Sequence, residues 1–239
     1  TVAESVSLYN VVEHLSFLTP ATGFYGIQVS YVGAHWNFSN ENGEFYGLAW
    51  SSTPLAVLPG ERIWMHPGGG SFGTADNWDP VAVPESQDTA VFDLNGSYVV
   101  TFSLDPTNLQ LRIGNDVVTF ALNGHTYALT SDGIAEPSVR VGAASGDAAQ
   151  LILSGGTLLS VDTVLADDVL STGQIVVGTG AMWTNTGHLL VGRLGVGTLT
   201  VENGGAVSTV SALLGDTSDA AGYVTVTGPN SAWTNIGDL

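Results

Sequence analysis

The chain has 239 residues, including 31 glycines and no cysteine, and 22 acidic residues against four arginines and no lysine give it a formal charge of −18. Nucleic acids and anionic membrane surfaces need clustered cations, so the composition argues against both as partners. Without cysteine there can be no disulfide and no thiolate metal site. The repulsion between so many negative charges is enough to keep the protein soluble and monodisperse.

Residues 1–62 are predicted to form an N-terminal cap or assembly region. Apolar residues between Leu8 and Leu18 recur at helical spacing, and Pro20 would end such a helix. The β-branched content of the same stretch leaves a strand open as the alternative. A repeat protein has to cover the open end of its core, and this region is in the right place to do so.

Aromatic residues crowd the second half of that region, and two short strands are expected there. The aromatic side chains that could contact a glycan or another subunit are Tyr31, Trp36, Phe45 and Trp50. Dense aromatic residues more often pack a small cap or a subunit contact than bind a sugar. Both interpretations stay open at this point.

Residues 63–102 lead into more regular sequence, and complete coils are expected from Tyr98 onward. A longer corner is expected at residues 131–137.

Arg112 and Arg140 occupy matching positions in successive units, each two residues before a glycine. Because stacked like charges repel each other, both side chains are expected to point outward beside acidic corners.

The C-terminal third contains an internal repeat. The triplet Trp183-Thr184-Asn185 returns 50 residues later as Trp233-Thr234-Asn235, and Gly187 and Gly237 follow at equal distances. Turn-forming clusters recur at half that period, for example at Asn203-Gly204-Gly205. A 50-residue period alone would fit a propeller blade, but the half-period favours a unit of 24–25 residues.

Each unit divides into three short β segments that align from one unit to the next, which predicts an all-β fold: a parallel β-helix with one unit per coil. Residues at matching positions would stack about 4.8 Å apart. Trp183 and Trp233 should then lie two coils apart with Val207 between them, and Asn203-Gly204-Gly205 should form a sharp corner. One inward ladder is expected to contain Val176, Leu199 and Val224.

Residues 178–208 and 222–239 resemble the passenger repeat of bacterial autotransporter adhesins of the diffuse-adherence type, and of related large surface proteins of Gram-negative bacteria. Residues 63–102 resemble the segment that precedes such repeats. The resemblance implies a right-handed β-helix over residues 63–239, located on the cell surface or outside the cell. It implies adhesion, aggregation or scaffolding and no active site.

Catalysis is the alternative, because some β-helices degrade polysaccharides with carboxylates gathered on one face. The dense acidic sites here are Asp162, Asp167-Asp168 and residues 216–219, all expected at corners. The five histidines have no ligand spacing, so no cofactor is expected, although Ca²⁺ at acidic corners is possible. The sequence therefore predicts a protein that is not an enzyme.

Two non-catalytic functions follow. The chain could be part of an adhesive β-helical scaffold that contacts surface polysaccharide or a receptor, or it could be the protomer of a head-to-tail extracellular filament. The sequence stops where a third β segment should begin, so further coils or a second copy are expected beyond Leu239.

No apolar run reaches the roughly 18 residues of a membrane-spanning helix, and no membrane insertion by this segment is expected.

Overall fold

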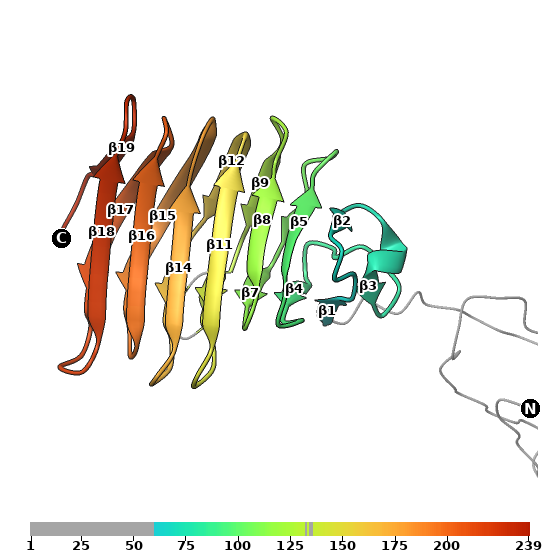
Figure 1. Ribbon diagram of the computed structural model, residues 1–239, viewed down its shortest axis with the longest axis horizontal. Coiled ribbons are helices and arrows are strands. Elements are labelled where there is room, and N and C mark those ends of the chain that lie inside the picture. Colours follow the sequence, from blue (N-terminus) through green and yellow to red (C-terminus); the bar gives the residue numbers. More distant parts are fainter. Residues whose placement is uncertain (1–59, 132, 134–135) are drawn as a thin grey trace, which may run out of the picture. The chain divides into compact units, whose positions relative to one another are not determined.

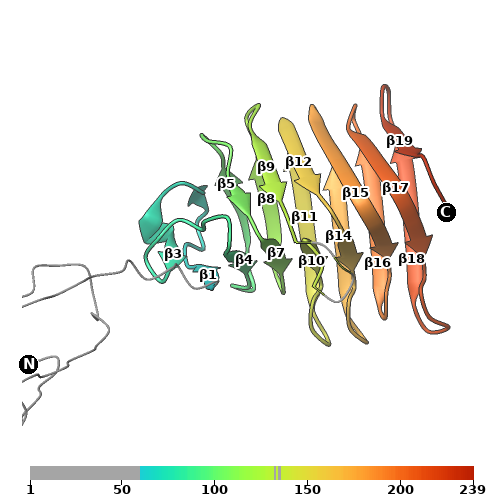
Figure 2. The same ribbon diagram turned by 180° about the vertical axis from the view of Figure 1, so that it is seen from behind.

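The computed structural model describes residues 60–131, 133 and 136–239. These residues form a parallel β-solenoid with three faces (Figure 1). In Figure 1 the front strands run upward, the strands behind them run downward (Figure 2), and the coils advance from right to left. The solenoid is therefore right-handed. The expected helix near Leu8 and the aromatic residues Tyr31, Trp36, Phe45 and Trp50 lie outside the described residues.

The first face is a seven-stranded sheet, and the second and third faces together form a twelve-stranded sheet. The first face consists of β2 (Gly70–Ser71), β5 (Ser97–Thr101), β8 (Val117–Ala121), β11 (Ala148–Ser154), β14 (Thr172–Val177), β16 (Val196–Glu202) and β18 (Ala221–Thr227). The second face consists of β6 (Thr107–Asn108), β9 (Thr126–Leu129), β12 (Gly156–Ser160), β19 (Ala232–Asn235) and the first parts of β15 (Ala181–Val191) and β17 (Ala206–Leu214).

The third face consists of β1 (Glu61–Trp64), β4 (Thr89–Phe92), β7 (Gln110–Ile113), β10 (Val139–Val141), β13 (Thr163–Leu165) and the second parts of β15 and β17. One short antiparallel strand, β3 (Trp78–Asp79), pairs with β1, and a single 3₁₀ turn, η1 (Ala75–Asn77), precedes it.

The strand register confirms the predicted period in the C-terminal coils. Thr172 pairs with Val196, and Val196 pairs with Ala221, so these coils contain 24 and 25 residues. One earlier coil is longer, because Val117 pairs with Gln150, 33 residues later along the chain. The longer corner expected at residues 131–137 falls within this coil, but residues 132, 134 and 135 lie outside the described residues. The solenoid also begins before Tyr98, since β1 pairs in parallel with β4 and β2 with β5.

The second and third β segments were predicted as separate strands, and in β15 and β17 they are continuous. Each of these strands bends from the second face to the third, and their pairing shifts register between Asn185 and His188. A bulge takes the place of a loop at this corner. This continuity joins the two faces into one sheet.

The inward ladder on the first face differs from the predicted one by a single residue. Leu199 pairs with Ile175 on one side and with Val224 on the other, and Ile175 and Leu199 are fully buried. Val176 pairs instead with Thr200 and points outward, so its assignment to the ladder was wrong. Alternate residues of a strand point to opposite faces, and a slip of one position therefore moves a side chain out of the core.

Large aromatic side chains fill the first coils. Phe72 lies 5.0 Å, ring centre to ring centre, from both Trp78 and Phe102, and Trp64 lies 5.0 Å from Trp78. The indole N–H of Trp64 donates to the carbonyl of His66, and that of Trp78 donates to the carbonyl of Phe72. Residues 63–102 therefore build the first, aromatic-rich coils of the solenoid itself.

Candidate functional site

The repeated Trp-Thr-Asn triplet lies on the second face, with its Trp and Asn side chains pointing into the solenoid. Trp183 pairs with Val207, and Val207 pairs with Trp233, which confirms the predicted alternation of large and small side chains. In the coils before these, the same row holds Leu158 and Tyr127. Alternation of this kind fills a narrow core without overcrowding it.

A hydrogen-bond network surrounds the first triplet. The indole N–H of Trp183 donates to the hydroxyl of Ser160 at 2.9 Å, and that hydroxyl donates to the amide oxygen of Asn185 at 2.9 Å. Thr163 donates to the same oxygen, and the amide nitrogen of Asn185 donates to the carbonyl of Gly187. The polar atoms of this buried network are satisfied within it, as a stable interior requires.

The second triplet repeats this arrangement. Trp233 donates to the hydroxyl of Thr209 at 3.0 Å, Thr209 donates to Asn235 at 2.8 Å, and Asn235 donates to the carbonyl of Gly237. In both copies the Trp reaches back to a hydroxyl in the preceding coil. The triplet residues thus bind one coil to the next, and this explains why Trp, Asn and Gly recur together.

The corner at Asn203-Gly204-Gly205 also has the predicted conformation. Asn203 and Gly204 have φ values of 53° and 84°, in the left-handed region. Position 205 requires glycine for a different reason: a Cβ there would collide with the backbone carbonyl of Val177 in the preceding coil.

The carboxylate of Asp162 connects three parts of the chain. It accepts hydrogen bonds from the backbone N–H groups of Gly133, at 2.5 Å, and His188, at 2.6 Å, and the His188 ring nitrogen Nδ1 lies 3.3 Å away. Burial alone would raise the pKa of Asp162, but the hydrogen bonds from His188 and Gly133 outweigh it and hold the pKa below its ordinary value. This carboxylate therefore holds the long corner and the bulge of β15 in place.

The depressed pKa of Asp162 predicts an acid-sensitive contribution to stability. Its stabilising effect is fully present above the unfolded-state pKa of about 3.9 and is lost as the pH falls through the lower folded-state value. Urea unfolding between pH 6 and pH 2.5 should show a shallower loss of stability for Asp162→Asn than for the native chain. Asp219→Asn, at an exposed position, should keep the native slope. Equal slopes for native and Asp162→Asn would contradict this role.

Asp167 bridges two arginines along the third face. Its side chain is 8% exposed, and its two oxygens lie 3.0 Å from Nε of Arg140 and 2.6 Å from Nη1 of Arg193. Arg140 stacks on Arg112, which pairs with Glu61 at 2.7 Å. The predicted outward arginines beside acidic groups are thereby confirmed, and the carboxylates offset the repulsion between them.

Asp162 is one of several buried aspartates that lie at the starts of strands, a pattern that the sequence analysis does not predict. Each of these residues directly precedes a strand and is at most 7% exposed. They are Asp88, Asp116, Asp147 and Asp162. Asp116 accepts from the backbone N–H groups of Leu94 and Gly96, about 20 residues earlier. Aspartate immediately before a β segment was the signal available in the sequence.

These contacts bear on metal binding. Within residues 60–131, 133 and 136–239, no group of three or more His, Asp or Glu side chains is placed to hold a metal ion. At the predicted acidic corners, the oxygens of Asp162 and Asp167 already contact N–H groups and guanidinium groups. Asp168 accepts from the N–H of Val169, while Asp216 and Asp219 lie on the exposed corner after β17.

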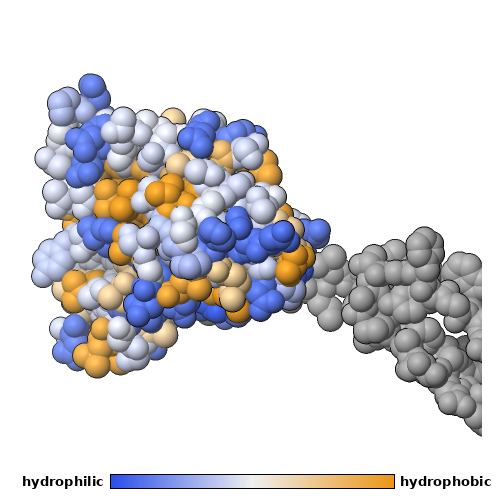
Figure 3. Space-filling view, turned by 45° about the vertical axis from the view of Figure 1, so that its right-hand side comes forward, coloured by the Kyte–Doolittle hydropathy of each residue, from blue (hydrophilic) through white to orange (hydrophobic). Residues whose placement is uncertain are grey.

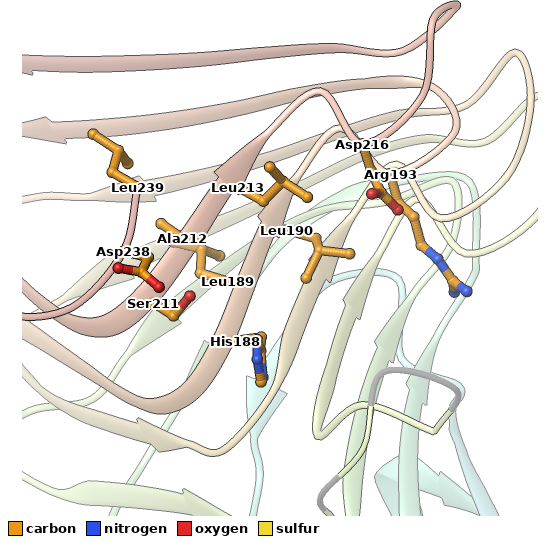
Figure 4. Close-up of a pocket in the computed structure, with 10 residues that line it drawn as sticks. All are labelled: His188, Leu189, Leu190, Arg193, Ser211, Ala212, Leu213, Asp216, Asp238 and Leu239. Carbon is orange, nitrogen blue, oxygen red and sulfur yellow. The ribbon is translucent and has the colours of Figure 1, made fainter.

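A hollow of about 360 Å³ lies on the third face beside the last coil (Figure 4). Its polar lining residues include His188, Arg193 and Asp216, and apolar side chains such as Leu190 and Leu213 lie between them. In Figure 4, Arg193 and Asp216 are drawn next to each other on one side, Ser211 and Asp238 near each other on the other, and His188 apart from both groups.

No protein-family model, no curated protein and no solved structure matches this chain. In the part of the chain that the structure describes, no helix is both long enough and apolar enough to cross a membrane.

Proposed function

We propose that this chain is a non-catalytic structural or adhesive protein of the cell surface or extracellular space, with the β-solenoid as a rigid scaffold. The observation that carries the proposal is the use of its polar residues. The repeated Trp and Asn residues and the carboxylates of Asp162 and Asp167 bind coil to coil. Asn and Asp are residue types that often act in catalysis, and here their side chains hold neighbouring coils together.

The charge distribution supports partners that are not strongly anionic. All four arginines of the chain pair with carboxylates, namely Arg62 with Asp88, Arg112 with Glu61, and Arg140 and Arg193 with Asp167. On the side drawn in Figure 3, hydrophobic residues form small patches separated by hydrophilic ones. Such a surface suits a soluble rod that contacts neutral polysaccharide or a receptor through limited areas.

Adhesion by the purified chain tests the proposal. Beads coated with the full chain should be retained on surfaces carrying polysaccharide or cell-surface glycoprotein more strongly than beads coated with an Ile175→Asp variant, whose core is disrupted. Retention equal to that variant on every surface would contradict an adhesive function.

A second candidate function is a head-to-tail filament. In the last described coil the Val226 side chain is 45% exposed, although its partners along the row, Val201 and Val177, are fully buried. A strand from a second copy, or from a further coil of the same chain, added in the register of β18 would cover Val226 and pair with the outer backbone groups of β18. Electron microscopy of material from the native cell surface should show uniform filaments if copies stack, and separate rods if they do not.

A further inference from the structure

The first face carries an outward row of neutral polar side chains that runs across its strands. Gln150 pairs with Gln174, Gln174 with Thr198, and Thr198 with Tyr223, so the four side chains occupy one row in four successive coils. A hollow of about 340 Å³ lies along this row and is also lined by Thr172 and Val196. We call this hollow the glutamine groove.

The glutamine groove offers hydrogen-bonding groups without charge. None of the residues that line it is Asp, Glu, Lys or Arg, although the chain as a whole has a formal charge of −18. The amide nitrogen of Gln150 donates to the amide oxygen of Gln174 at 2.6 Å. This bond fixes both amides and leaves the nitrogen of Gln174 able to donate, and the oxygen of Gln150 able to accept, at the surface.

An aromatic side chain continues the row. Tyr223 is 58% exposed and follows Thr198 in register. Tyrosine combines a flat apolar ring with a polar hydroxyl and is enriched where one surface must contact both apolar and polar groups. The face of a sugar ring has this mixed character.

We propose that the glutamine groove binds a neutral polysaccharide chain lying along the solenoid axis, an inference that rests on the proposed adhesive function. The matching groups repeat from coil to coil about every 4.8 Å, which suits a linear polymer and many weak contacts in series. A nucleic acid or acidic glycan would need cations that the groove lacks. A peptide strand would need a free sheet edge, but β11, β14 and β16 are paired on both sides.

Affinity electrophoresis of the full chain through gels containing a soluble neutral glucan, xyloglucan or galactomannan tests this inference. At least one of these polymers should retard the native chain, and the retardation should persist at high salt. Gln174→Ala and Tyr223→Ala should each weaken binding about fivefold or more, as the loss of a hydrogen bond or a stacked ring would. Thr184→Ala, an outward position on the second face, is the matched control and should bind as the native chain does.

The outcomes separate this inference from the proposed function. If coated beads adhere but Gln174→Ala and Tyr223→Ala bind like the native chain, the scaffold adheres through another surface and the glutamine groove is not the binding site. Binding only to pectate or alginate, lost at high salt, would also contradict a neutral-polysaccharide site in the glutamine groove. So would the absence of binding to any neutral polymer, or the burial of this face between two copies in solution. Thermal melting of each variant should match that of the native chain, so that weaker binding reports the groove and not unfolding.

Discussion

Replacing Leu199 with Asp is expected to destabilise the solenoid by about 4 kcal/mol or more, because it buries a charge without a partner. Leu199 is fully buried between Ile175 and Val224 in the inward ladder of the first face. Natural domains have only about 5–15 kcal/mol of stability, so the variant should be close to unfolded at room temperature. Urea unfolding monitored by circular dichroism measures the difference.

The matched control for this substitution is Val176→Asp. Val176 lies in β14 next to Ile175 but points outward and is only partly buried. Its replacement should cost much less than that of Leu199, even though both substitutions add the same charge to adjacent strands. Similar losses from Leu199→Asp and Val176→Asp would contradict the register of the first face.

Replacing Trp183 with Ala should cost about 3–5 kcal/mol, the usual range for removing a large buried aromatic side chain. Trp183 is fully buried, and its indole N–H holds the hydroxyl of Ser160 in the network around Asn185. The substitution leaves a cavity against Leu158 and Val207 and removes a link between coils. The difference is measured as a shift in the urea midpoint.

Trp233→Ala is the comparison that the repeat itself provides. Trp233 makes the equivalent hydrogen bond to Thr209, but its ring is only partly buried. Its loss should cost clearly less than that of Trp183. If the two substitutions had equal effects, the burial of Trp183 between neighbouring coils would not be the source of its contribution.

The period and the Trp alternation could be predicted from the sequence because a solenoid stacks each coil in register on the last. Positions 24 or 25 residues apart then become neighbours, and Trp183, Val207 and Trp233 have to form one row. The sequence alone did not determine which side chains of a strand face the core. Val176 and Ile175 are both β-branched and apolar, so composition alone could not show which of them faces the core.

The sequence shows the buried aspartates directly before β segments, but it does not show which backbone groups they contact. Acidic residues at corners look like exposed charges, and the partners of Asp116 and Asp162 lie about 20 to 29 residues away. Only the stacking of coils brings those backbone N–H groups to the carboxylates. The same stacking brings Gln150, Gln174, Thr198 and Tyr223 into one outward row.

We propose that the corner carboxylates stabilise the scaffold and take no part in catalysis. The most direct test is to incubate the purified full chain with pectate, alginate and neutral glucans and to measure reducing ends and unsaturated products. We expect the native chain to release no more reducing ends or unsaturated products than an Asp167→Asn sample. Reproducible release by the native chain that disappears in Asp167→Asn or Asp168→Asn, with the melting temperature of each variant unchanged, would contradict it.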